Sequence, residues 1–211
     1  MRRLALSMRV TEASNYLEMR NSLAFEYVEL FEKLGFIVIP IPNNSKHVTK
    51  YIEELNVDGV VLTGGNNVNP LLYNGKNELE SVYKQRDETE RELVDVAIKN
   101  NIPLLGICRG FHYLNIHFGG SIHHNVKDHV KKDHVLISKN KNLNKTLTNS
   151  YHNQAILKNN LSKYFEIIAS TEDNVIEAFH HRKYKILGIQ WHPERQDIKE
   201  DQEIIADFFN K

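Results

Sequence analysis

The stretch Pro103-Leu-Leu-Gly-Ile-Cys-Arg-Gly110 sets the architecture expected of this chain. The apolar run predicts a buried strand over 103–107, and the residues from Cys108 to about Phe118 predict a helix that ends before Gly119-Gly120. Small residues on both sides of Cys108 allow a sharp turn that lifts its side chain out of the sheet. A strand that passes directly into a helix in this way indicates an α/β protein.

The same alternation of short apolar runs and amphipathic segments extends through the chain, which is typical of a mostly parallel sheet with crossover helices. No internal repeat and no linker interrupts it, so we expect a single domain over residues 1–211. The segment 121–160 is rich in Asn, Lys and His and has no clear assignment. The predicted strands are 4–10, 36–40, 58–62, 165–170, 175–180 and 186–190, and the further predicted helices are 22–34, 48–55, 88–100 and 198–209.

Composition excludes several classes of protein. The formal net charge of +0 argues against a general nucleic-acid binder, and no apolar stretch is long enough to span a bilayer. The single cysteine cannot form an intramolecular disulfide, and the apolar run at the N-terminus is too short for a signal peptide. We therefore expect a cytoplasmic protein that binds neither nucleic acid nor membranes.

Cys108 is the candidate nucleophile. The helix that follows it directs its N-terminal amides and positive dipole end toward the sulfur, which favours thiolate over thiol. A lone cysteine is more often a buried structural residue, so this motif needs support from elsewhere in the chain.

The stretch Gly188-Ile-Gln-Trp-His-Pro-Glu194 supplies that support. His192 follows a predicted late strand, and parallel strands end at one edge of a sheet, so His192 can meet Cys108. His192 can accept the thiol proton and later protonate a leaving amine, while Glu194 holds the ring and fixes its tautomer. These three residues form the predicted catalytic triad.

The stretch Leu62-Thr-Gly-Gly-Asn-Asn-Val-Asn-Pro70 follows the third predicted strand at the same edge. Glycines let backbone amides approach a ligand closely. We expect the backbone N–H groups of Gly65 and Arg109 to form an oxyanion hole. A simple Gly-Gly turn is the alternative interpretation of this segment.

Together these three stretches resemble the core motifs of class I glutamine amidotransferase-like domains, and more narrowly those of the γ-glutamyl-γ-aminobutyrate hydrolase family. The resemblance covers about residues 1–211 and includes Asn149-Ser-x-His152-x-Gln154 and Val175-Ile-Glu177-Ala178. It implies a flavodoxin-like three-layer sandwich with a mostly parallel sheet. It also implies hydrolysis of a γ-glutamyl amide through a γ-glutamyl thioester, with no cofactor and no catalytic metal.

Two positions depart from the family pattern. His112 stands where the superfamily commonly has Gln, four residues after the nucleophile, and His124-Asn125 replaces a Gln-Asp pair. Both changes fall near the expected pocket, so an altered leaving group is expected. The residues expected to contact substrate are Gly64, Asn66, His112, His124, Ser150, Tyr151 and His152.

The segment 121–145 is rich in lysine and histidine. Its local positive charge suits a phosphate or nucleotide group, although a solvated surface is the alternative. Its histidines leave a metal site open as a further, less favoured alternative. Within the family, these features fit the γ-glutamyl-CDP-amidate hydrolases, which free a cytidine diphosphoramidate for capsule decoration. The residues concerned are Lys127, Lys131, Lys132, Lys139, Lys141, Lys145, His123, His124, His129 and His134.

Three other functions stay open at this stage. The chain can be a hydrolase of γ-glutamyl-aminobutyrate in polyamine catabolism, or a glutaminase subunit that delivers ammonia to a synthetase. It can also be a non-enzymatic binding protein on the same fold. His112 and the Arg-Gly pair after Cys108 argue against the glutaminase, so we expect a small-molecule γ-glutamyl conjugate as partner and no obligatory synthetase. Oligomerisation is possible.

Overall fold

The computed structural model describes residues 1–76, 79–140, 143 and 146–210. Its centre is an eight-stranded sheet in the order β4-β1-β5-β6-β14-β13-β12-β9. The neighbours from β4 to β14 are parallel, and β13, β12 and β9 continue the sheet in antiparallel fashion. The strands of this sheet are β1 (Arg2–Ser7), β4 (Phe36–Ile41), β5 (Gly59–Leu62), β6 (Leu104–Ile107), β9 (Ile137–Ser138), β12 (Phe165–Ser170), β13 (Ile176–His181) and β14 (Ile186–Ile189).

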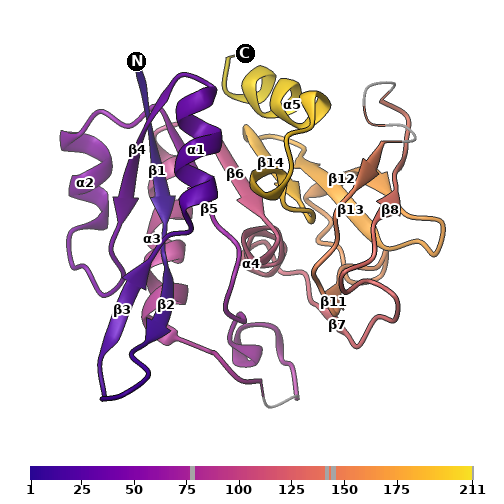
Figure 1. Ribbon diagram of the computed structural model, residues 1–211, viewed down its shortest axis with the longest axis horizontal. Helices are drawn as coiled ribbons and strands as arrows, with labels where there is room; N and C mark the ends of the chain where they lie inside the picture. The colour runs from indigo at the N-terminus through magenta and orange to yellow at the C-terminus, as the bar shows by residue number, and fades with distance from the viewer. Residues whose placement is uncertain (77–78, 141–142, 144–145, 211) are drawn as a thin grey trace.

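Helices cover both faces of the sheet, which confirms the predicted three layers (Figure 1). Apolar side chains of α2, α3 and α4 share one core cluster with one face, and those of α1 and α5 share a second cluster with the other. Strand residues alternate between the clusters, so that Val60 and Leu62 enter the first and Val61 the second. The helices are α1 (Phe25–Lys33), α2 (Val48–Glu54), α3 (Lys84–Lys99), α4 (Arg109–His117) and α5 (Lys199–Asn210), with 3-10 turns at η1 (Pro70–Tyr73) and η2 (Pro193–Arg195).

The predicted strand 4–10 is wrong as a single element. The sheet strand ends at Ser7, and the chain then forms a hairpin of β2 (Arg9–Glu12) and β3 (Met19–Ser22) outside the main sheet. Ser22 pairs with Arg9 in this hairpin, so the first helix begins at Phe25 and not at residue 22. Amphipathic alternation does not say where a strand leaves its sheet.

The helix predicted over 88–100 begins four residues earlier, at Lys84. Its first turn buries Arg86 and Asp87, which the apolar pattern could not reveal because both are charged. The remaining predicted helices and sheet strands are confirmed to within two residues at each end.

The unassigned segment 121–160 forms short antiparallel pairs beside the sheet. β11 (Gln154–Ala155) pairs with β7 (His123–His124), and β10 (Leu147–Thr148) pairs with β8 (His134–Val135). Elements of two residues carry no periodicity, which is why the sequence did not predict them. Among the described residues, no helix is long and apolar enough to cross a membrane.

Candidate active site

Cys108 occupies a strained turn between β6 and α4. Its backbone has φ 51° and ψ −100°, a conformation that a residue with a side chain adopts only when its surroundings enforce it. The Cys108 N–H donates to the Ile189 carbonyl at 2.9 Å, and the Cys108 carbonyl accepts the first helical bond from the His112 N–H at 3.1 Å. Gly110 allows this turn, because a Cβ there would collide with the backbone of Leu62.

His192 and Glu194 lie at the end of β14, directly beside this turn. The His192 Nδ1 and the Glu194 Oε1 are 2.6 Å apart, and His192 lines the same cavity as Cys108. Both His192 and Glu194 are at least nine-tenths buried. The structure thus places the hydrogen-bonded pair of His192 and Glu194 beside Cys108.

The charges of Cys108, His192 and Glu194 influence one another. Burial alone would raise the pKa of Cys108, but the charge and hydrogen bond of His192 outweigh burial and lower it. Burial opposes the charged form of His192, yet Cys108 and Glu194 raise the pKa of its ring to about 10. Each group thus favours the charged form of the other, a thiolate beside an imidazolium, which is the reactive form of a cysteine nucleophile.

Asn149 fixes the backbone of His192, and the sequence did not single it out as a site residue. Its side-chain amide donates to the His192 carbonyl at 2.7 Å and accepts from the His192 N–H at 2.9 Å. Trp191, also buried, donates its indole N–H to Asp201 of α5 at 2.9 Å. The available signal was the motif Asn149-Ser-x-His152-x-Gln154, which begins with this residue.

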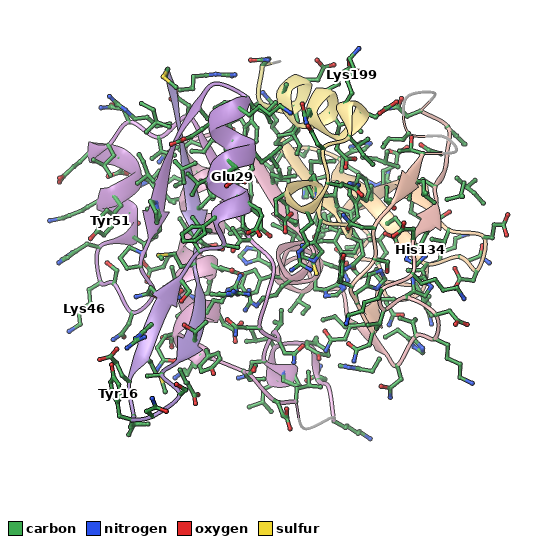
Figure 2. All side chains as sticks on the ribbon, viewed as in Figure 1. Tyr16, Glu29, Lys46, Tyr51, His134 and Lys199 are labelled. Atoms are coloured by element: carbon green, nitrogen blue, oxygen red, sulfur yellow. The ribbon has the colours of Figure 1, made fainter. Side chains whose placement is uncertain are left out.

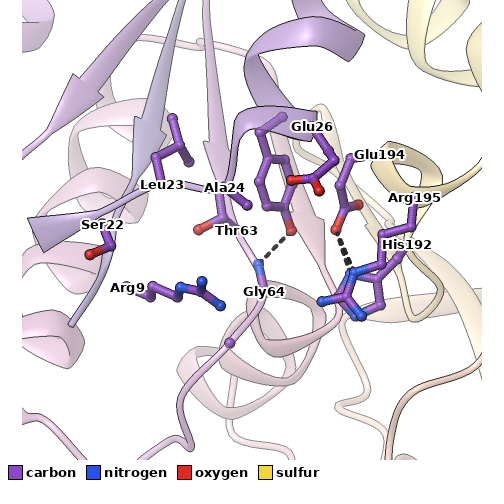
Figure 3. Close-up of a pocket in the computed structure, with 12 residues that line it drawn as sticks. Arg9, Ser22, Leu23, Ala24, Glu26, Thr63, Gly64, His192, Glu194 and Arg195 are labelled. Atoms are coloured by element: carbon purple, nitrogen blue, oxygen red, sulfur yellow. Dashed lines mark hydrogen bonds and ion pairs between the residues drawn. The ribbon is translucent and has the colours of Figure 1, made fainter. Parts of the chain in front are cut away.

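The turn after β5 lies against the same group of residues (Figure 3). The Gly64 N–H donates to the Tyr27 hydroxyl at 2.9 Å, and that hydroxyl also contacts Glu194. A Cβ at Gly64 would lie 2.9 Å from His192 Cε1 and 3.6 Å from Cys108 Cβ, so only glycine fits without displacing the ring. Tyr27 is a further residue that sequence reasoning missed, because it also counts as an apolar position of α1.

A buried network of ion pairs holds the turn after β5 in place. Arg86 donates to the carbonyls of Thr63, Gly64 and Gly65, and its Nε lies 2.9 Å from Glu90. Arg109 pairs with Asp87 at 2.5 Å and with Glu90. The Arg109 side chain therefore points into this network and anchors the start of α4.

Two cavities meet at His192. One of about 180 Å³ is lined by Cys108 together with Gly65 and Arg109, the two residues predicted to supply the oxyanion hole. The other, of about 240 Å³, lies on the side of Tyr27 and Glu194. We take the cavity that contains the sulfur as the substrate cavity, because a nucleophile must reach its substrate.

Five of the seven residues expected to contact substrate line one of the two cavities. Asn66, His112, Tyr151 and His152 line the substrate cavity, and Gly64 lines its neighbour. Burial lowers the pKa of His112 to about 3, so its ring is neutral at physiological pH. The side-chain amide of Asn66 is engaged with the backbone of Val10, which leaves the Asn66 backbone for the cavity.

His124 and Ser150 do not line the substrate cavity. His124 stacks on Tyr73 and shares a 3.1 Å hydrogen bond with its hydroxyl. The Ser150 hydroxyl donates to the backbone carbonyl of His129. Their predicted contact with substrate therefore needs a longer substrate or a movement of the chain.

The lysines of the basic segment are exposed and do not line the substrate cavity, with Lys141 and Lys145 lying outside the described residues. Arginines line the cavities instead of these lysines. Arg195 lines both cavities and stacks over the Tyr151 ring at 4.6 Å, and Arg9 lines the neighbouring cavity. Figure 3 shows Arg9 and Arg195 on opposite sides of Gly64.

Comparison with known proteins shows the family of the chain. The family model of peptidase C26 matches residues 4–194. A γ-glutamyl-CDP-amidate hydrolase of Campylobacter jejuni is 32% identical over 212 residues, covering 98% of this chain and 97% of the relative. A glutamine-hydrolysing GMP synthase subunit of Methanocaldococcus jannaschii is 25% identical and covers 72% of each chain.

Solved structures share the fold. A Thermoplasma acidophilum protein described as a candidate GMP synthase subunit superposes with a TM-score of 0.72 at 19% identity, covering 100% of this chain and 93% of that one. A glutamine amidotransferase of Thermotoga maritima gives a TM-score of 0.61 at 17% identity, covering 92% of this chain and 76% of that one. The α/β class predicted from the sequence is thereby confirmed.

Proposed function

The chain belongs to the peptidase C26 family, a class I glutamine amidotransferase-like group, and from this premise we propose that it is a γ-glutamyl hydrolase with Cys108, His192 and Glu194 as its catalytic triad. At the coarse level, the family and the γ-glutamyl-CDP-amidate hydrolase relative both support hydrolysis of a γ-glutamyl amide.

The observation that carries this proposal is the position of Cys108 in one cavity with His192, whose ring is hydrogen-bonded to Glu194. Structural cysteines are usually inert and buried among apolar groups. Here Cys108 lines a cavity, and its backbone has φ 51°. It lies beside His192, whose pKa is raised to about 10. Strain and charge at one residue are typical of a nucleophile.

The reaction follows from these positions. The Cys108 thiolate attacks the γ-carbonyl carbon, and the Gly65 and Arg109 N–H groups stabilise the oxyanion. Imidazolium His192 gives its proton to the leaving nitrogen, which breaks the C–N bond and leaves a γ-glutamyl thioester. Neutral His192 then takes a proton from water, which attacks the thioester and releases glutamate. Glu194 stabilises the imidazolium throughout.

For the leaving group, we propose a phosphoramidate of a nucleotide, as in γ-glutamyl-CDP-amidate, which would serve synthesis of a capsule phosphoramidate. The relative of that name aligns over 98% of this chain. Arg109 and Arg195 line the substrate cavity, but the guanidinium of Arg109 pairs with Asp87 and Glu90, and guanidinium groups such as that of Arg195 pair with phosphate oxygens in two-point contacts. We therefore assign phosphate recognition to Arg195 in place of the exposed lysines.

The test is release of glutamate by the purified chain from a panel of γ-glutamyl conjugates, with Cys108→Ala as the matched blank. The panel holds γ-glutamyl-aminobutyrate, glutamine, glutathione, folate polyglutamate and a γ-glutamyl nucleotide phosphoramidate. We expect release that depends on Cys108 and is fastest for the phosphoramidate. Release from γ-glutamyl-aminobutyrate alone would overturn the narrow substrate and leave the hydrolase, whereas equal release by Cys108→Ala would overturn both.

A second function is favoured by the resemblance to the GMP synthase chain of Methanocaldococcus jannaschii, whose name describes glutamine hydrolysis. In that case the chain would pass ammonia to a synthetase. Activity of the isolated chain separates the two, because a hydrolase acts alone and a glutaminase of this kind is expected to need its partner. If the isolated chain released glutamate from none of the conjugates, the glutaminase would be favoured.

A further inference from the structure

Four ligand-type side chains meet next to the substrate cavity without a role in the proposed reaction. One nitrogen each from His129, His134 and His152 and one oxygen of Glu177 all lie within 4.8 Å of one another. Glu177 comes from β13, His134 from β8, and the other two from loops of the segment 121–160. Figure 2 marks His134, which lies on the side of the molecule formed by β12 and β13.

The two most buried histidines hold their outer nitrogens in fixed hydrogen bonds. The His129 Nε2 lies 2.8 Å from the Asp173 carboxylate, and the His152 Nδ1 lies 2.9 Å from the Gln154 carbonyl. Since both partners are acceptors, each of these nitrogens carries the proton. The remaining nitrogens, Nδ1 of His129 and Nε2 of His152, then present lone pairs toward the cluster, as in histidines that ligate a metal.

The inner atoms of the cluster lack partners. Among the described residues, none makes a hydrogen bond to His129 Nδ1, His134 Nε2, His152 Nε2 or either oxygen of Glu177, although all are buried. Glu177 is fully buried, and a carboxylate in that position is costly unless a cation neutralises it.

An ion pair between His152 and Glu177 is the simplest alternative. The two atoms concerned are 3.4 Å apart, without hydrogen-bond geometry. This pair would neutralise Glu177, but among the described residues it would leave His129 Nδ1 and His134 Nε2 without a hydrogen-bond partner. A single cation at the centre accounts for all four groups.

We propose that His129, His134, His152 and Glu177 bind one divalent transition-metal ion, with Zn²⁺ as the best match. Three imidazoles and one carboxylate are ligands that Zn²⁺ accepts in tetrahedral geometry, and hard ions such as Mg²⁺ prefer oxygen ligands. Four protein ligands leave no open position, so the ion is structural and the triad works without it. The site differs from the one considered from the sequence, because His123 and His124 lie elsewhere.

The ion would join the segment that carries His129 and His134 to the main sheet. Because His152 also lines the substrate cavity, metal binding fixes one wall of that cavity. Ile122, Leu136 and Leu143 of the basic segment already pack into the two core clusters, and the metal would add a further attachment to the sheet.

The direct test is a titration of the purified, chelator-stripped chain with Zn²⁺, and with Co²⁺ as a spectroscopic probe. All titrations use the Cys108→Ala background, so that the thiolate at the other end of the cavity contributes nothing. We expect one Zn²⁺ per chain, the intense visible absorption of tetrahedral Co²⁺, and no comparable binding of Mg²⁺.

Three variants locate the ion. His134 is half-buried on the two-residue strand β8, so His134→Ala should fold and should weaken Zn²⁺ binding by on the order of 100-fold or more. Asp173, an exposed carboxylate, accepts from the Thr171 hydroxyl and is hydrogen-bonded to the outer nitrogen of His129, and Asp173→Asn should weaken Zn²⁺ binding about tenfold. The matched control is His123→Ala, an exposed histidine outside the cluster, which should bind as the parent does.

Absence of stoichiometric Zn²⁺ binding would overturn the proposal and leave the His152–Glu177 ion pair. Binding that His134→Ala leaves unchanged would place the ion elsewhere and equally overturn it. Neither outcome depends on catalysis, so the proposed hydrolase stands or falls on separate measurements.

Discussion

Gly64→Ala should damage the active site through a single methyl group. The new Cβ would lie 2.9 Å from His192 Cε1 and 3.1 Å from the Tyr27 hydroxyl. Carbon atoms in contact are ordinarily about 3.5–4.0 Å apart, so the His192 ring must move by roughly 0.6 Å or more. Since φ at Gly64 is outside the left-handed region, alanine adds no backbone strain.

A displacement of about 1 Å from reacting geometry can cost about 100-fold in rate, so we expect kcat/KM to fall by about 10–100-fold. The assay is glutamate release from the best conjugate of the panel, together with the rate of Cys108 alkylation at neutral pH. Alkylation should slow as well, because His192 no longer lowers the pKa of Cys108.

The matched control is Gly59→Ala at the opposite end of β5. A Cβ there would lie 2.5 Å from Phe209 and 2.6 Å from Leu4, so its crowding is at least as severe but remote from the sulfur. It should lower the free energy of unfolding by about 1–3 kcal/mol and leave kcat/KM nearly unchanged. A Gly64→Ala enzyme with full activity would refute the placement of His192 against this turn.

Three further predictions follow from the same contacts. Glu194→Gln keeps the shape of the site but removes the charge that raises the pKa of His192, and kcat should fall by about 10³–10⁴-fold. Because His192 lowers the pKa of Cys108, alkylation by iodoacetamide should reach half its maximal rate below pH 8.5, the approximate value for a free thiol, and His192→Ala should move that midpoint upward. Arg86→Met leaves Glu90 buried with one cation fewer, so chemical denaturation should report a loss of about 3–5 kcal/mol; a loss under about 1 kcal/mol would contradict the proposed support of the turn.

The sequence predicted the elements of the sheet and the meeting of Cys108 with His192 because both follow from simple rules. Apolar runs mark buried strands, and parallel strands end at one edge. In the structure the last residues of β6 and β14, Ile107 and Ile189, pair with each other, so the segments that carry Cys108 and His192 leave the sheet side by side.

The supporting residues were harder to predict. Arg86, Asp87 and Glu90 are buried because they pair with one another and with Arg109, and a charged residue in a helix ordinarily indicates a solvent-facing position. Tyr27 counts as an apolar core position until its hydroxyl is seen to reach Gly64.

The histidine cluster depends on contacts that no local pattern encodes. His129 and His134 are near each other in the sequence, but Glu177 comes from a separate strand, and its burial is known only once β13 is placed in the sheet. The sequence grouped His123 and His124 with them, whereas these two form β7 and pair with β11.

The central claim is that Cys108 is the nucleophile for a γ-glutamyl group. It is tested most directly by treating the chain with a glutamine-mimicking diazoketone, followed by mass spectrometry of the digested protein and an activity assay. The account predicts one covalent adduct, on Cys108, formed in step with loss of glutamate release and slowed by His192→Ala. Complete labelling of Cys108 with activity retained, or loss of activity with Cys108 unmodified, would contradict it.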